Sequence, residues 1–324
     1  MWSLEAQAAF NAFLWDNDVF SPKETDAYYT NGFTFHHVSD PVPAERGRQW
    51  AACPGLAWLS RKFASHLIST DADSEFRHSW EAGQIIQTPL DKQANPPDPE
   101  DQPYAGLLYA GCNYHVQSGD RAETLGVQFG VVGPWSLAEQ GQHVAHKAIG
   151  AREAKGWSGQ LRNEFVANVR YDRQQVLVKA LLGSRELTVF DNMDVALGPL
   201  LTSASAGINV LFASDVDAAF GLNPNYLGRY PHIIAGRPLG FYTMGTLQVS
   251  GVLHNLFLSG NTWVDSPASV DHEPLLASAQ MLFGYGFSCW ALQLGLNVST
   301  RTFQSQDVQW PRYGSLAVTW GCRQ

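Results

Sequence analysis

Side chains of opposite character alternate along residues 290–299, and this pattern limits the possible folds more than any other feature. The large apolar positions are Trp290, Leu292, Leu294, Leu296 and Val298. The positions between them are small or polar, namely Ala291, Gln293, Gly295, Asn297 and Ser299. Because successive side chains of a β-strand point to opposite faces, this alternation predicts a strand between two different environments.

The same alternation recurs along most of the chain. It is clear at residues 165–171 and 316–320. Less regular candidate strands lie at 4–16, 28–38, 78–88, 104–116, 123–132, 174–182, 187–199, 203–213, 239–250, 251–259 and 274–288. About a dozen strands in 324 residues predict an all-β chain, with residues 1–324 forming one closed antiparallel barrel domain.

The position of the apolar face decides between a membrane barrel and a soluble one. The chain is 45% hydrophobic and 16% charged, which excludes disorder. It has no run of roughly 18 apolar residues, so we expect no transmembrane helix. A soluble β-sandwich or lipocalin-like barrel remains the alternative, since periodicity does not show whether the apolar side chains point inward or outward. The small and polar opposite face favours a transmembrane barrel of a bacterial outer membrane.

Charge and cysteine content exclude several other classes of protein. A net charge of −9 argues against binding to nucleic acid. The four cysteines are far apart without a C-x-x-C pair, so we interpret them as small apolar residues and not as a zinc site. Met1 is not followed by a signal peptide, which is typical of a mature form given a start methionine. Hydrolase and nucleotide-binding signatures such as G-x-S-x-G and the P-loop are absent.

Two segments interrupt the strand pattern. Residues 89–103 are rich in proline and acidic side chains, which predicts an exposed loop. Within residues 136–162, we expect a short helix near 138–155, with Gly150 or Gly156 ending it. Gln142 and His146 would then share one helical face, which Glu153 would continue.

His146 is the candidate general base, because imidazole titrates near neutral pH without perturbation. The alternative is that His146 and His143 are solvated residues on a surface helix.

A second candidate site lies near the N-terminus. Asp16, Asn17 and Asp18 precede a segment from Thr25 to Gly32 that is also rich in carboxylate, amide and hydroxyl oxygens. Ca²⁺ prefers such ligands. The alternative is turn chemistry, in which Asp and Asn side chains bond their own backbone.

Six motifs in order resemble the lipid A 3′-O-deacylase family. They are Asp16-Asn17-Asp18, Asp26-Ala27-Tyr28-Tyr29-Thr30-Asn31-Gly32, Gln84 to Thr88-Pro89, Pro103-Tyr104-Ala105-Gly106, Gln142-x-x-x-His146, and Gly156-Trp157-x-x-Gln160-Leu161-x-Asn163-Glu164. Each motif is short, but the ordered set covers about half of the chain and is densest from 14 to 165.

The resemblance implies a twelve-stranded outer-membrane barrel that removes the 3′-linked acyloxyacyl group of lipid A in a Ca²⁺-dependent reaction. By position, His146 corresponds to the general base and Asp18 to the carboxylate associated with calcium. Asn17 and Thr30 correspond to polar groups lining the reacting centre, and Gln142 to a neighbouring amide. The implied partner is lipopolysaccharide, and the implied state is a monomer.

The chain departs from the family pattern at two places. The carboxylate expected shortly after the histidine falls on Arg152, so Glu153 takes that role only if one residue has been inserted. Gln102 replaces an arginine before Pro103, which removes a cation that could touch lipid phosphate. Two other functions fit the same features: a non-catalytic structural or transport barrel, and an outer-membrane phospholipase.

Overall fold

The computed structural model describes residues 9–17, 28–43, 74–150, 152–214 and 239–322. Within these ranges twelve long antiparallel strands and one two-residue strand form a single sheet. The long strands are β1 (Phe10–Asn17), β2 (Tyr28–Val38), β4 (Glu75–Thr88), β5 (Ala105–Ser118), β6 (Arg121–Val132), β7 (Glu164–Leu182), β8 (Arg185–Leu197), β9 (Leu201–Ala213), β10 (Gly240–Asn255), β11 (Leu275–Gly286), β12 (Trp290–Ser299) and β13 (Arg312–Trp320). The short one is β3 (Val42–Pro43).

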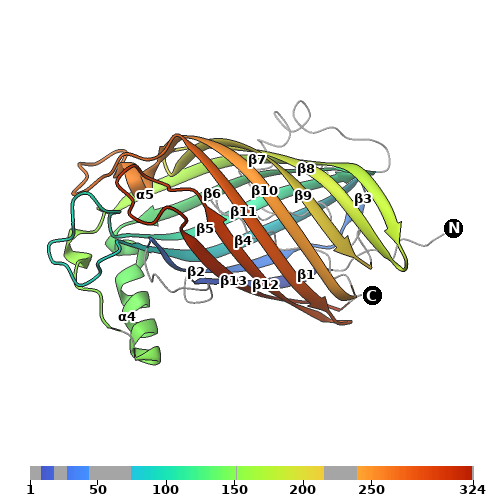
Figure 1. The fold of residues 1–324 in the computed structure, drawn as a ribbon, viewed down its shortest axis with the longest axis horizontal. Helices are drawn as coiled ribbons and strands as arrows, with labels where there is room; N and C mark the ends of the chain where they lie inside the picture. The colour runs from blue at the N-terminus through green and yellow to red at the C-terminus, as the bar shows by residue number, and fades with distance from the viewer. Residues whose placement is uncertain (1–8, 18–27, 44–73, 151, 215–238, 323–324) are drawn as a thin grey trace.

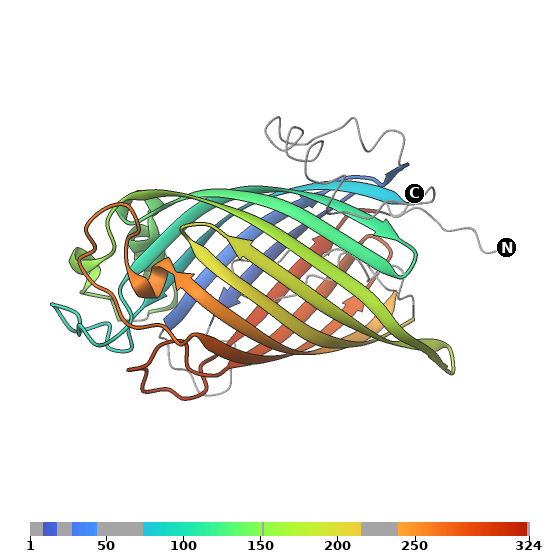
Figure 2. The same ribbon diagram turned by 90° about the horizontal axis from the view of Figure 1, so that it is seen from above.

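The sheet closes on itself, because β1 pairs with β13 and β2 pairs with β4. The predicted closed barrel of about twelve strands is therefore confirmed (Figure 2). The described residues also form four short helices, namely η3 (Pro134–Ser136), α4 (Ala138–Ile149), η4 (Trp157–Gly159) and α5 (Leu256–Ser259). Helices α4 and α5 lie at the end of the barrel opposite the one at which β13 finishes (Figure 1). No helix in the described ranges is long and apolar enough to cross a membrane.

The apolar face of the strands points outward. Along β12, Leu292, Leu294 and Leu296 are exposed, whereas Gln293 and Gly295 between them are buried. The lumen is crossed by polar side chains that bond from strand to strand: the Asn209 amide donates to Asn192 at 2.9 Å, and the Gln280 amide donates to Asn297 at 2.8 Å. A polar lumen inside an apolar band is the arrangement of an outer-membrane barrel, so the soluble alternative is wrong.

Some predicted boundaries are wrong because the barrel ladder continues through polar or small residues. Segments 165–171 and 174–182 are one strand, since Asp172 and Arg173 pair across to β6. Segments 239–250 and 251–259 are not two strands: Gly251 pairs on both sides within β10, and the chain then turns into α5 at Leu256.

Three of the cysteines, Cys112, Cys289 and Cys322, are disulfide-bonded, so the interpretation as small apolar residues is wrong for them. Cys289 and Cys322 form a disulfide that joins the turn between β11 and β12 to the segment after β13. The two cysteines are 33 residues apart in the sequence, so the sequence did not indicate that they pair. The closed sheet brings them together.

Candidate functional site

Helix α4 lies against the outer wall of the barrel at the ends of β4 and β5. Ala138 in its first turn is buried, and a Cβ at Gly106 of β5 would come within 2.1 Å of the Ala138 Cβ. Glycine is therefore required at residue 106 for the helix to approach so closely. The Gln84 amide of β4 also donates to the Ser136 carbonyl at 2.7 Å, just before the helix.

The outward face of β4 carries every second residue, namely Gln84, Ile86 and Thr88. Ile86 packs with Ala138 and Trp157 outside the wall. Its neighbour Ile85 packs in the lumen, in a cluster that includes Leu14 and Tyr29. This face of β4 is the surface to which the helix and the β1–β2 hairpin both contribute.

A β-bulge in β2 places Thr30 on that outward face. Tyr29 pairs with Gln87 and Asn31 pairs with Ile86, so Thr30 is the extra residue between them. A bulge redirects a side chain that regular alternation would turn to the other side. The Tyr29 hydroxyl donates inward to Asp16 at 2.9 Å, while the Thr30 hydroxyl lies 2.5 Å from the Thr88 hydroxyl.

Asn17 lies beside this bulge at the end of β1. Its amide donates to the Asn31 side-chain oxygen at 3.4 Å, and the Trp15 indole donates to the same oxygen at 2.8 Å. Trp15 is exposed on the outer wall, which shows that Asn17 and Asn31 face the same way. Asp18, the predicted metal ligand, lies outside the described residues.

Helix α4 brings Gln142 and His146 to one face, as predicted from their spacing. Both side chains are buried, at 2% and 5% exposure. The Gln142 side-chain oxygen accepts a hydrogen bond from the Trp157 indole at 2.7 Å. The His146 Nδ1 lies 2.7 Å from the Arg152 carbonyl oxygen. Because a carbonyl only accepts, Nδ1 carries the proton, and the neutral imidazole presents Nε2 as a base.

The surroundings of His146 keep it neutral. Burial lowers the pKa of His146 below its usual 6.5. The hydrogen bond to the Arg152 carbonyl raises this pKa, the positive charge of Lys92 lowers it, and the negative charge of Glu153 raises it. The net direction is downward, which suits a group that must accept a proton near neutral pH.

Gly150, one of the two predicted ends of the helix, is confirmed, whereas the predicted extension to about residue 155 and the predicted position of Glu153 are wrong. Helix α4 ends at Ile149, where Gly150 adopts the left-handed conformation at φ 71° and donates to the His146 carbonyl. Glu153 lies beyond this cap and does not continue the helical face. Its carboxylate pairs with His143 at 3.3 Å, and both side chains are more than half exposed. Where the family pattern has a carboxylate, the group bonded to His146 is the Arg152 backbone carbonyl.

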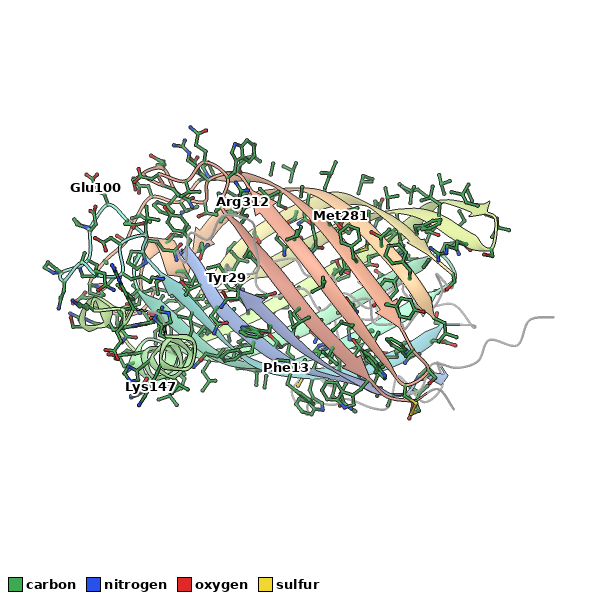
Figure 3. The ribbon with its side chains drawn as sticks, turned by 60° about the horizontal axis from the view of Figure 1, so that its bottom comes forward. Phe13, Tyr29, Glu100, Lys147, Met281 and Arg312 are labelled. Carbon is green, nitrogen blue, oxygen red and sulfur yellow. A yellow bond between two sulfur atoms is a disulfide. The ribbon has the colours of Figure 1, made fainter. Side chains whose placement is uncertain are left out.

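Four predicted residues therefore border one surface outside the barrel, and we call Asn17, Thr30, Gln142 and His146 the outer-wall site. Figure 3 shows Lys147, which follows His146 in α4, at the same end of the barrel as Glu100 of the proline-rich loop. In the described ranges, no group of three or more His, Cys, Asp or Glu side chains could hold a metal ion.

Two groups that influence His146 were not predicted from the sequence. Lys92 approaches His146 closely enough for its charge to influence the imidazole. It is the only lysine between residues 89 and 103, and a lone cation in an acidic loop was a signal that could have been used. The Arg152 carbonyl carried no signal, since a backbone group leaves no trace in side-chain pattern.

The profile of the family described as outer membrane protein LpxR matches residues 3–322. The chain belongs to the LpxR family. This outer-membrane family is the one that the six ordered motifs indicated, and the closed barrel agrees with it.

Three solved structures are similar to this chain to different degrees. LpxR from Salmonella typhimurium superposes with a TM-score of 0.76 at 18% identity, covering 96% of this chain and 99% of that one. The β domain of the Bordetella autotransporter BrkA gives a TM-score of 0.40 at 7% identity, covering 97% and 99%. The translocator domain of NalP from Neisseria meningitidis gives 0.37 at 7% identity, covering 98% and 89%. A search of curated protein sequences finds no match.

The departure from the LpxR-family pattern at Gln102 has a different consequence from the one expected. The Gln102 side chain is buried and donates to the Gln87 side-chain oxygen at 2.6 Å and to the Tyr28 carbonyl at 3.2 Å. It lines a cavity of about 150 Å³ in the barrel interior, together with Tyr29 and Gln87. Gln102 therefore does not face lipid, and its lack of charge does not bear directly on lipid phosphate.

Proposed function

We propose that this protein hydrolyses the 3′-linked acyloxyacyl ester of lipid A in the outer membrane. The observation that carries the proposal is the position of a buried, neutral histidine on the outside of the barrel wall. A lipid whose acyl chains lie against the apolar band reaches such a site without leaving the bilayer. A site in the lumen would require the lipid to cross the wall.

The end that carries α4 would face the cell exterior, where lipopolysaccharide lies. The proposed reaction requires this orientation, because α4 carries the proposed base and lipid A lies in the outer leaflet.

The proposed reaction begins when the His146 Nε2 accepts a proton from a water molecule. The oxygen of that water attacks the ester carbonyl, and the bond from carbonyl carbon to sugar oxygen then breaks. The imidazolium returns its proton to the departing alkoxide, so that the products are a fatty acid and a free hydroxyl. Through this cycle the Arg152 carbonyl keeps the ring oriented by accepting from Nδ1.

Negative charge develops on the ester oxygen during this attack, and positive charge nearby stabilises it. Lys92 is a cation beside His146. Ca²⁺, when bound, would add positive charge of the same kind. Asp18 would hold the ion, beside the amide and hydroxyl oxygens of Asn17 and Thr30, and this oxygen-only donor set suits a hard cation.

A glycerophospholipid ester is the second substrate class that this chemistry fits, because the same base and cation serve any ester carbonyl. A non-catalytic structural or transport barrel is the third possibility. The deciding experiment is mass spectrometry of lipid A and phospholipids from cells that express the protein, with and without a calcium chelator.

We expect lipid A to lose the mass of one acyloxyacyl group while phospholipids stay intact. His146→Ala should abolish the change. His143→Ala is the matched control, because His143 is exposed on the same helix and should leave the change intact. Unaltered lipid A with the wild-type protein would contradict the proposal, and lysophospholipid formation would favour the phospholipase.

A further inference from the structure

The segment that follows helix α4 folds back beside it and contacts both buried polar side chains of the helix. Its Arg152 carbonyl accepts from His146, and its Trp157 indole donates to Gln142. The two contacts are similar in length, 2.7 Å each, yet the proposed reaction uses only the first. The second contact bears on the role of the Gln142 amide.

The Trp157 contact determines which way the amide points. An indole nitrogen can only donate, so the atom of Gln142 that faces it must be the oxygen. The amide nitrogen then lies on the other side. The oxygen and nitrogen of an amide side chain have nearly the same shape, so the hydrogen-bond partner decides which atom is which.

The Gln142 amide nitrogen is buried, and none of the described residues accepts a hydrogen bond from it. A buried donor without an acceptor costs free energy, so a chain retains one mainly where something else supplies the acceptor. Gln142 lies one helical turn from the proposed base, on the same face. A substrate oxygen at the outer-wall site would supply the missing acceptor.

Trp157 itself is held firmly. Its ring packs on Tyr104 with centroids 4.9 Å apart, and its backbone lies in the η4 turn. A Cβ at Gly156 would come within 2.4 Å of the Tyr104 ring, so glycine there permits the contact. The Tyr104 hydroxyl in turn donates to the Lys92 carbonyl at 3.1 Å. The indole donor is therefore fixed in place before any substrate arrives.

We propose that Trp157 is a positioning residue that orients the Gln142 amide so that its nitrogen donates a hydrogen bond to the carbonyl oxygen of the scissile ester. This inference rests on the proposed ester hydrolysis. It adds a neutral donor to the charges that stabilise the developing oxyanion, and a preorganised donor of this kind acts mainly on the transition state.

The test compares four purified full-length proteins in detergent, with lipopolysaccharide as substrate and released fatty acid as the readout. The variants are Trp157→Phe, Gln142→Leu and the double variant, beside wild type. We expect Gln142→Leu to lower kcat about 100-fold or more and Trp157→Phe about 10-fold or more, with KM changed less than about 3-fold. The double variant should be no slower than Gln142→Leu, because both changes remove the same donor.

The control is Trp135→Phe, which alters an exposed tryptophan on η3 that packs against Phe165 and does not contact Gln142. It should keep wild-type kcat. Folding of every variant is checked by urea unfolding. A folded Trp157→Phe protein with wild-type kcat would overturn the inference, as would a double variant whose loss is the product of the two single losses.

If Trp157→Phe does not fold, Gln142→Glu replaces it. This change keeps an oxygen for the Trp157 indole and removes the donor, so a folded Gln142→Glu protein with wild-type kcat would also overturn the inference. A wild-type protein that releases no fatty acid would instead contradict the proposed function itself, and the two failures are thereby distinguished.

Discussion

The His146 ring donates from Nδ1 to the backbone carbonyl of Arg152, across 2.7 Å. The acceptor is main chain, so what matters at residue 152 is the path of the backbone and not the side chain. That path depends on Gly150, which ends α4 in the left-handed conformation at φ 71°. The orientation of the proposed base thus depends on a turn four residues after it.

This relationship predicts opposite effects for two neighbouring substitutions. Arg152→Ala should keep ester hydrolysis within about 3-fold of wild type, because the carbonyl remains. Gly150→Val should lower kcat strongly, since a β-branched residue is strained at positive φ and the returning segment would shift. Gly150→Asn, which tolerates this conformation, should fall between them. Equal losses in Arg152→Ala and Gly150→Val would show that the guanidinium matters instead.

The pH dependence of hydrolysis should report the surroundings of His146. Only the neutral ring is active, so activity falls as pH drops through the pKa. Because that pKa is lowered, the acid limb should lie below pH 6.5. Lys92→Met removes a neighbouring positive charge and should move the limb to higher pH, whereas Glu153→Gln should move it to lower pH. Lys147→Met, on the exposed side of α4, is the control for a general change in charge. Shifts in the same direction for the first two variants would contradict this account.

Calcium should be required for hydrolysis but not for the barrel. Chelation should abolish fatty acid release, and added Ca²⁺ should restore it. Asp18→Asn should raise the Ca²⁺ concentration needed for half-maximal activity about 10-fold or more, because a charged ligand becomes neutral. Asp120→Asn, in a turn at the opposite end of the barrel, should leave it unchanged. Full activity in the presence of chelator would exclude the proposed metal.

Substitutions of the paired hydroxyls of Thr30 and Thr88 should affect stability and activity differently. Thr88→Val leaves a buried Thr30 hydroxyl without its partner and should lower the free energy of unfolding by about 1–3 kcal/mol. Adding Thr30→Val should recover most of that loss, because both polar groups are then gone. Hydrolysis should not recover with it, since the Thr30 hydroxyl is proposed to line the reacting centre. Urea unfolding and fatty acid release measure the two quantities in the same samples.

The outward apolar face predicts a depth-dependent penalty for charge. Leu294→Arg, in the middle of β12, should lower the free energy of unfolding in lipid vesicles by about 2–4 kcal/mol. Ser184→Arg, in the turn between β7 and β8, should change it by less than about 0.5 kcal/mol. If Leu294→Arg left the free energy of unfolding unchanged, this face would not contact lipid.

The sequence by itself determined the class of fold and pointed to most of the residues of the proposed site. Alternation of apolar and polar side chains has a fixed geometric meaning in a strand, so about a dozen strands followed from it. The spacing of Gln142 and His146 placed them on one helical face, because a helix repeats every 3.6 residues. The family followed from six short motifs, since their order along the chain is far more specific than any one of them.

Only the tertiary structure decided which face of the wall meets lipid and what surrounds each site residue. The alternation has the same period whether the apolar side chains point into the barrel or out of it. Only the closed sheet showed that they point outward. The bulge at Thr30 depends on the register of β2 against β4, which is a property of the pair of strands. The Arg152 carbonyl and the Trp157 indole act through contacts made after the chain folds back on α4, and no local pattern specifies such contacts.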